Sequence, residues 1–157
     1  MKVVINACFG GFSLSNRGIK AYCERKGIPC HFFRRDGLKG PYTRITDAQA
    51  FAEKSIFGVD AFSCETPEEI PSQDNWHAMT QEERVASNAA YTAIAVPCSR
   101  DISRNDADLV AVVELMGNKA NGQCAQLKVV EIPDGTEFQI EEYDGSEHVA
   151  ESHQTWS

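Results

Sequence analysis

The sequence lacks long apolar runs. Although 42% of its 157 residues are hydrophobic, no stretch approaches the roughly 18 to 20 consecutive apolar residues that span a bilayer. The N-terminus turns polar at Asn6 and therefore lacks the apolar stretch of about 7 to 15 residues that export signals contain. These absences predict a protein that is neither exported nor embedded in a membrane, and a chain of this length is enough for one packed domain.

Metal-binding and disulfide patterns are also missing. The chain has six cysteines, but none of them forms a Cys-x-x-Cys pair. Cys23, Cys30 and His31 have neither the spacing of a zinc knuckle nor a second half. His148 and His153 are five residues apart, so they would point away from each other on a helix. We therefore expect reduced, mostly buried thiols, with no bound metal or cofactor.

Positive charge is scarce. Fifteen Lys and Arg residues face 23 Asp and Glu residues, which gives a net charge of −8. Direct binding to nucleic acid is not expected, because phosphate contacts require clustered basic side chains. Residues 131 to 151 are strongly acidic, with eight of the 23 Asp and Glu residues and no Lys or Arg. One basic group precedes them in the chain: Arg25, Lys26, Arg34, Arg35 and Lys39. Solvated charges around a helix end and a turn explain this basic group better than an anion site does.

The first third of the chain predicts a strand, a helix and a second strand. Val3–Ile5 is a β-branched run, and the glycine pair at 10 and 11 predicts a tight turn after it. Apolar positions then recur at helical spacing over residues 15 to 26, and Gly27 occupies the usual place after a helix end. Residues 28 to 33 are a second apolar segment. This order predicts a βαβ unit with a parallel strand pair.

The middle of the chain is harder to interpret. Residues 36 to 75 show no clean hydrophobic period, although a short helix is expected at 47 to 54. A capping-box pattern at Thr66 leaves room for barely one turn, whereas the one at Thr80 begins a helix that runs towards Tyr91. Residues 92 to 97 are predicted to form a buried strand.

The strongest helix signal covers residues 106 to 116. Ser103 or Asn105 is expected to cap this helix, and the neighbouring charges of Arg104 and Asp106 are interpreted as salt links and capping groups. Gly117 ends the helix. Its broad apolar face comprises Leu109, Val110, Val112, Val113, Leu115 and Met116.

Two alternating segments near the C-terminus predict a hairpin. Residues 127 to 132 and 138 to 142 are joined by a Pro-Asp-Gly turn and would leave one face wet. Together these patterns predict an α/β or α+β fold: one compact domain over residues 1 to 157, a mixed sheet with an N-terminal βαβ unit, and a C-terminal antiparallel hairpin.

The segment between the first strand and the first helix is the best candidate for a ligand site. Helix N-termini present unpaired N–H groups, and glycine lets a ligand approach the backbone. The segment lacks the Gly-Lys-Ser/Thr of a P-loop and the three-glycine spacing of dinucleotide folds, and the serines are equally suited to capping the helix. The candidate ligand-binding residues are Cys8, Gly10, Gly11, Ser13, Ser15, Arg17, Arg34 and Arg35.

Cys8 is also a weak candidate for a catalytic nucleophile. A helix dipole lowers the pKa of a nearby thiol, but the cysteine phosphatase pattern requires an arginine where this chain has Leu14. A buried cysteine at a strand end is the simpler interpretation, and no catalytic residue is assigned.

Four blocks of the chain carry a resemblance to a known family. The first is Val3-Val4-Ile5-Asn6-Ala7-Cys8-Phe9-Gly10-Gly11-Phe12-Ser13-Leu14-Ser15, and the second is Asp101-Ile102-Ser103-Arg104-Asn105-Asp106 with Leu109-Val110. The third runs from Lys119-Ala120-Asn121-Gly122 through Leu127 to Pro133, and the last comprises Ile140 to Gly145 and His153 to Trp156. Their sequence resembles a family of small, mostly uncharacterised proteins encoded by bacteriophages and prophages. Residues 36 to 95 look like a variable insertion. Gln154 stands where the family pattern has arginine before the terminal Thr-Trp.

The resemblance implies a context rather than a reaction. It implies a phage accessory protein in the cytoplasm of the infected bacterium. Such a protein would act on host machinery or host defence by binding, either by inhibiting a defence protein or by sequestering a nucleotide signal. The alternatives are a small enzyme acting on a nucleotide or phosphorylated substrate, and a structural or virion-associated protein. The expected partner is a host protein or a small nucleotide-like ligand, and self-association into a homo-oligomer is left open.

Overall fold

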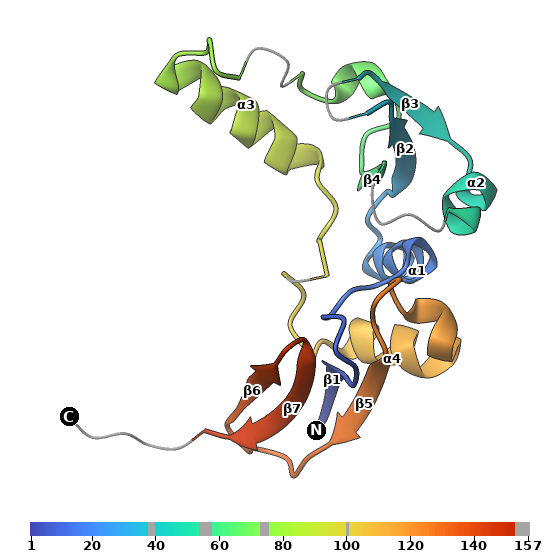
Figure 1. Cartoon of the computed structure of the whole chain (residues 1–157), viewed down its shortest axis with the longest axis vertical. Helices are drawn as coiled ribbons and strands as arrows, with labels where there is room; N and C mark the ends of the chain where they lie inside the picture. Colours follow the sequence, from blue (N-terminus) through green and yellow to red (C-terminus); the bar gives the residue numbers. More distant parts are fainter. Residues whose placement is uncertain (38–39, 54–57, 73–75, 100, 153–157) are drawn as a thin grey trace. The chain divides into compact units, whose positions relative to one another are not determined.

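The computed structural model describes residues 1–37, 40–53, 58–72, 76–99 and 101–152 (Figure 1). The chain divides into two compact units: Met1–Lys26 with Pro97–Ser157 form the first, and Gly27–Val96 form the second. The second unit contains the segment at about 36 to 95 that the sequence marks as an insertion, but it begins earlier, at residue 27. The single domain expected over residues 1 to 157 stays a prediction.

The first unit contains two antiparallel strand pairs. Strand β1 (Lys2–Asn6) pairs with β5 (Leu127–Glu131), and Val4 lies opposite Val129. Strands β6 (Phe138–Tyr143) and β7 (Ser146–Glu151) form the C-terminal hairpin, and β7 packs beside β1 (Figure 1). A C-terminal hairpin is therefore confirmed. The predicted pairing of 127–132 with 138–142 is wrong, because β5 pairs with the N-terminal strand instead.

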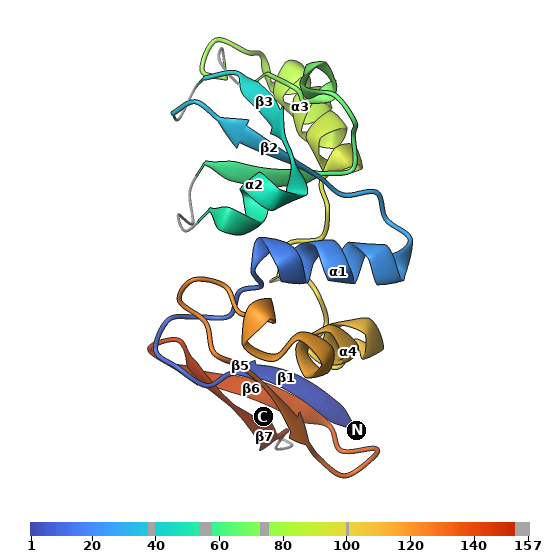
Figure 2. The same cartoon turned by 90° about the vertical axis from the view of Figure 1, so that its right-hand side faces the viewer.

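Two helices stack on the β1–β5 pair, with only one of them directly against the strands. Helix α4 (Ala107–Met116) contacts both strands, and α1 (Asn16–Lys26) packs on α4, so α4 lies between α1 and the strands (Figure 2). A short turn of 3₁₀ helix, η2 (Gly117–Ala120), follows α4. The core between these layers contains Val4, Phe12, Leu14, Tyr22, Ile102, Leu109, Val110, Val112, Val113 and Ala120.

Local sequence patterns predicted α1 and α4 correctly, but they predicted the wrong N-cap residue for α4. Gly27 has a positive φ of 68° after α1, as expected of a residue that ends a helix. The cap of α4 is Asp106, whose side chain accepts hydrogen bonds from the amides of Asp108 and Leu109. The expectation of Ser103 or Asn105 is corrected. Ser103 instead donates its hydroxyl hydrogen bond to the Asn105 side chain, at 2.6 Å.

The second unit is built on a three-stranded antiparallel sheet in the order β3–β2–β4. The strands are β3 (Tyr42–Ile45), β2 (His31–Arg35) and β4 (Val59–Phe62). The predicted βαβ unit is wrong, because β1 and β2 belong to different sheets and every strand pair in the described residues is antiparallel.

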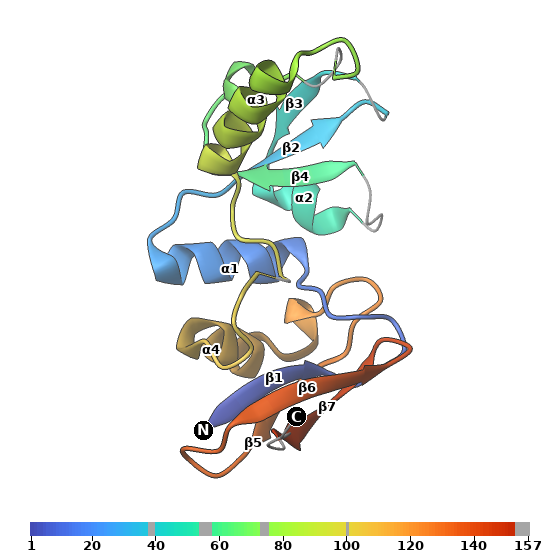
Figure 3. The same ribbon diagram turned by 90° about the vertical axis from the view of Figure 1, so that its left-hand side faces the viewer.

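Helices lie on opposite faces of this sheet (Figure 3). Neighbouring residues of a strand point to opposite faces. Phe32 of β2 contacts Phe51 of α2 (Asp47–Ala52), whereas Phe33 contacts Phe62, whose ring meets Tyr91 of α3 (Gln81–Ile94). A 3₁₀ turn, η1 (Pro67–Glu69), packs against β3.

The strand predicted at residues 92 to 97 is also wrong. Helix α3 continues through Ile94, and only Ala95 forms an isolated bridge, to Phe62. Apolar residues in this segment therefore belong to the end of a helix that packs on the sheet. No helix in the described part of the chain has the length and apolar character needed to cross a bilayer.

Candidate functional site

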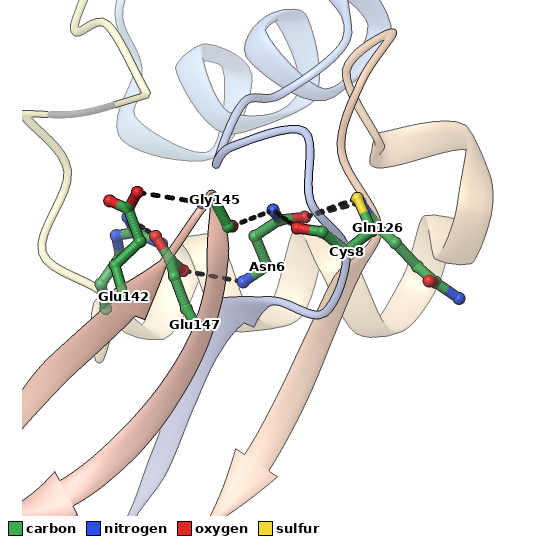
Figure 4. Close-up of polar contacts among 7 residues, drawn as sticks. Asn6, Cys8, Gln126, Glu142, Gly145 and Glu147 are labelled. Atoms are coloured by element: carbon green, nitrogen blue, oxygen red, sulfur yellow. Dashed lines mark hydrogen bonds and ion pairs between the residues drawn. The ribbon is translucent and has the colours of Figure 1, made fainter.

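Asn6, the last residue of β1, is the centre of a buried polar network. It is fully buried, and its side-chain Nδ2 donates to the carbonyl oxygens of Cys8 and Gly145, at 2.7 and 2.6 Å (Figure 4). Its Oδ1 accepts a hydrogen bond of 2.8 Å from the amide of Gln126. One amide group thus joins the loop after β1, the β6–β7 turn and the start of β5. Sequence patterns did not identify this role, although a polar residue directly after an apolar run was its local sign.

Glu147 and Arg104 extend this network. Glu147 is 8% exposed, and its carboxylate accepts a hydrogen bond of 2.8 Å from the backbone amide of Asn6. The same carboxylate accepts hydrogen bonds from both terminal nitrogens of the Arg104 guanidinium, at 3.0 and 2.8 Å. The guanidinium also lies 3.2 Å from the ring centre of Phe12. A bidentate, partly stacked arginine is held more tightly than an exposed ion pair. The salt link expected at Arg104 is therefore present, and its partner lies in the acidic hairpin.

The glycines in this region allow three backbone segments to pack closely. A Cβ atom on Gly10 would lie 1.6 Å from the carbonyl oxygen of Cys124, and one on Gly145 would lie 2.6 Å from the amide nitrogen of Gly11. Gly145 also has a positive φ of 84° in the β6–β7 turn. The close approach at Gly10 is therefore to the protein's own backbone.

Cys8 sits among hydrogen-bond acceptors. Its Sγ is 3.4 Å from the side-chain oxygen of Asn6 (Figure 4). It is also 3.3 Å from the carbonyl oxygen of Cys124. Neither neighbour supplies the base or the positive charge that activates a cysteine nucleophile. None of the six cysteines is in a disulfide bond, and no group of His, Cys, Asp or Glu suited to a metal ion occurs among the residues the structure describes. His153 lies outside those residues.

The serines of the candidate segment form hydrogen bonds within the protein. Ser15 caps α1: its hydroxyl accepts from the Gly18 amide at 3.1 Å and donates to the carbonyl oxygen of Lys119 at 2.6 Å. The Ser13 carbonyl accepts the amide of Gly122, at 2.9 Å. Of the two serines proposed as the cap, Ser15 takes that role, and its hydroxyl is committed to backbone partners.

The arginines assigned to the same site belong to different units. Arg17 is an exposed residue of α1 in the first unit, with Cys8, Gly10, Gly11, Ser13 and Ser15. Arg34 and Arg35 belong to β2 of the second unit. The other basic residues also have partners, because Arg25 pairs with Asp108, and Lys26 pairs with Asp106 and Asp108. Lys39 lies outside the described residues. A shared ligand for the whole set stays a prediction.

Two large hydrophobic side chains are exposed next to the segments that Asn6 connects. Phe9 is 72% exposed in the loop after β1, and Tyr143 is 78% exposed at the end of β6. The β6–β7 turn that follows Tyr143 packs on the backbone of Phe9, Gly10 and Gly11 through Gly145. We call Phe9–Gly11 together with Tyr143–Gly145 the aromatic loop surface. Its exposure was not visible in the sequence, where Phe9 and Tyr143 resemble ordinary core residues.

The chain next to the aromatic loop surface is acidic. Glu141, Glu142 and Asp144 are exposed and flank Tyr143 in the sequence, and no Lys or Arg occurs after Lys128. Glu141 is 3.0 Å from the His148 ring nitrogen, and Glu142 accepts the Gly145 amide at 3.0 Å. The surface therefore combines exposed aromatic rings with negative charge.

Comparison of the chain with protein-family models, with curated proteins and with solved structures finds no match.

Proposed function

We propose that this protein acts by binding a host protein through the aromatic loop surface. The observation that carries the proposal is the exposure of Phe9 and Tyr143 on loops fixed from beneath by buried Asn6 and Glu147. Exposed aromatic side chains on a rigid base are the residues that dominate many protein interfaces, because they bury much area at little entropic cost.

The charge near the surface indicates what kind of partner would fit it. Glu141, Glu142 and Asp144 are exposed and flank Tyr143 in the sequence, so a complementary partner would present Lys or Arg beside an apolar patch. Such a partner would associate faster at low salt than at high salt. The resemblance to phage and prophage proteins supports a host defence protein in the bacterial cytoplasm as the target. Inhibition by occupying a surface requires no catalytic group, which agrees with the surroundings of Cys8.

The experiment compares two exposed aromatic side chains with a similarly exposed aliphatic side chain elsewhere in the first unit. A Phe9→Ser/Tyr143→Ser variant removes both rings, whereas the control Leu115→Ser removes a side chain that is 78% exposed on α4 of the same unit. Each tagged protein is incubated with cytosolic extract of a phage-susceptible bacterium, and captured proteins are quantified by mass spectrometry. Affinity for the recovered partner is then measured with purified components.

The double variant is expected to weaken partner binding by at least about tenfold, since truncating one hot-spot residue costs more than about 1 kcal/mol. Leu115→Ser is expected to bind as the wild type does. Equal capture by all three proteins would remove the aromatic loop surface as the contact area. An equal loss in the Leu115→Ser control would also contradict the proposal, because it would indicate nonspecific apolar adhesion.

A further inference from the structure

A hollow of about 290 Å³ opens on the second unit, beside the ends of β2 and β3 and next to η1. This volume is close to the lower end of the roughly 300 to 1,000 Å³ usual for small-molecule sites. Rings and aliphatic groups form much of its wall, with one guanidinium among them: Arg35, Pro41, Tyr42, Pro67, Ile70 and Pro71.

Arg35 is positioned in this hollow without an acidic partner. Its Nε donates to the carbonyl oxygen of Gly40 at 3.3 Å, and its guanidinium lies 5.3 Å from the ring centre of Tyr42. No carboxylate within the described parts of the chain forms an ion pair with it. Its neighbour Arg34 differs, because Arg34 points to the other face of the sheet and pairs with Glu53 at 3.2 Å.

Tyr42 provides a fixed and neutral wall. Its hydroxyl donates to Oδ2 of Asp60 at 3.0 Å, and its ring meets the edge of Phe62, with ring centres 5.6 Å apart. Burial, and then the nearby Asp60 carboxylate, raise the pKa of Tyr42, so the phenol carries no negative charge near neutral pH. The phenol of Tyr42 therefore adds no negative charge to the hollow beside Arg35.

We propose that this hollow is a binding site for a small organic anion in which the negative group is attached to a flat apolar ring. The two terminal nitrogens of Arg35 are free of described partners and offer the parallel donors that carboxylate and phosphate oxygens accept. The ring of the ligand packs against the proline rings and Ile70, the last of which belongs to the buried core. This inference is independent of the aromatic loop surface, whose residues all lie in the first unit.

Glu68 sets a limit on the affinity. It lines the same hollow, is exposed, and carries a charge that repels an anion. Its presence therefore provides an internal test, because replacing it by glutamine removes the repulsion while keeping the size of the side chain. If Arg35 holds the anion, removing the charge of Arg35 must lower the affinity and removing the charge of Glu68 must raise it.

The two common sources of such an anion are an aromatic carboxylate and a mononucleotide. Benzoate and adenosine monophosphate are therefore the probes, and inorganic phosphate and adenosine test the anion and the ring separately. Binding to the full chain is measured by calorimetry and by NMR shifts of the residues lining the hollow. At least one of the two probes is expected to bind with a Kd below about 1 mM, and more tightly than phosphate or adenosine alone.

Four variants decide the assignment. Arg35→Gln is expected to weaken binding at least tenfold, Arg35→Lys to weaken it less, and Glu68→Gln to tighten it about two- to fivefold. Arg34→Gln removes the same charge from the same strand and is expected to change the Kd less than twofold. Circular dichroism checks that each variant is folded. If Arg35→Gln does not fold, the weaker binding expected of Arg35→Lys tests the role of Arg35 in its place.

Three results would overturn the proposal. The first is that neither probe binds, and the second is that adenosine binds as tightly as adenosine monophosphate while benzoate does not bind. The third is that Arg34→Gln and Arg35→Gln weaken ligand binding equally. Phosphate binding as tightly as both ring-bearing probes would refute the ring contact. Arg35→Gln is also expected to leave capture of the protein partner unchanged, so failure of this inference is distinguishable from failure of the aromatic loop surface.

Discussion

At the scale of single residues, buried polar groups hold the aromatic loop surface in place. Asn6 is fully buried, and both its amide nitrogen and its side chain are hydrogen-bonded. Glu147 connects this residue to Arg104. Such groups stabilise one arrangement only while every partner is present, because a buried donor or charge left alone pays its full desolvation cost.

Glu147→Gln is therefore expected to lower the free energy of unfolding by about 2 to 4 kcal/mol, since it leaves the Arg104 guanidinium mostly buried without its counter-charge. The matched control is Glu141→Gln in the same hairpin. Glu141 lies 3.0 Å from the ring nitrogen of His148, both side chains are exposed, and removing an exposed contact of this kind changes stability little. Urea denaturation measures both, and equal losses would show that the buried pair has no special role.

At the scale of elements, helix α4 is fixed by its first turn. One carboxylate oxygen of Asp106 accepts hydrogen bonds from the amides of Asp108 and Leu109, at 2.9 and 3.1 Å. Its other oxygen accepts a hydrogen bond of 2.8 Å from the Lys26 ammonium group of α1. One carboxylate thus caps α4 and links it to the helix packed on it. Burial acts to raise the pKa of Asp106, but the hydrogen bonds from Lys26 and the two amides outweigh burial and lower it.

Asp106→Ala is expected to destabilise the protein by about 1 to 2 kcal/mol, because it removes the cap. Asp106→Asn keeps a capping oxygen and loses only the charge, so its cost is smaller. Thermal or urea unfolding at pH 7 separates the two variants. An alanine variant no less stable than the asparagine variant would argue against capping by this residue.

The Asn variant also tests the pH dependence. The folded pKa of Asp106 lies below its unfolded value of about 3.9, so the charge contributes its full stability above that value and loses it as pH falls through the folded pKa. The stability difference between wild type and Asp106→Asn is therefore expected to be constant from pH 7 to 5 and to shrink below about pH 4. A difference that persists unchanged at pH 2 would contradict the lowered pKa.

At the scale of the whole molecule, each of the two units has an apolar cluster of its own among the residues that the structure describes. The cluster around Val4 and Leu109 contains only residues of the first unit, and the cluster around Phe33 and Phe62 contains only residues of the second. The second unit is an insertion in the sequence of the first. Its apolar cluster is small, so we expect it to be the less stable of the two.

Two core truncations are expected to act on different parts of the chain. Leu109→Ala should cost about 2 to 4 kcal/mol in the first unit, and Phe33→Ala about 3 to 5 kcal/mol in the second. Hydrogen exchange resolved by residue measures where protection is lost. If each change lowers protection throughout the chain equally, the protein unfolds as the one domain predicted over residues 1 to 157, and the two-unit division has no energetic meaning.

The sequence by itself determined the elements whose causes are local. Helix α1 follows from its apolar spacing and Gly27, α3 from the capping box at Thr80, and α4 from its apolar face and Gly117. Strand β1 follows from Val3–Ile5. In each case, the residues that specify the element lie within a few positions of it, so hydrogen bonding and side-chain spacing can be evaluated along the chain.

Only the tertiary structure decided which strands pair and which residues meet. The turn at Pro133–Gly135 suited a hairpin, but Val129 pairs with Val4 because burial of β1 against α4 needs a second apolar strand beside it. Asn6 gained its role from contacts with residues 126 and 145, far away in the chain. Arg34 and Arg35 are adjacent in sequence, yet one pairs with Glu53 and the other faces a hollow. These outcomes depend on contacts between distant segments and on strand alternation, which local patterns do not encode.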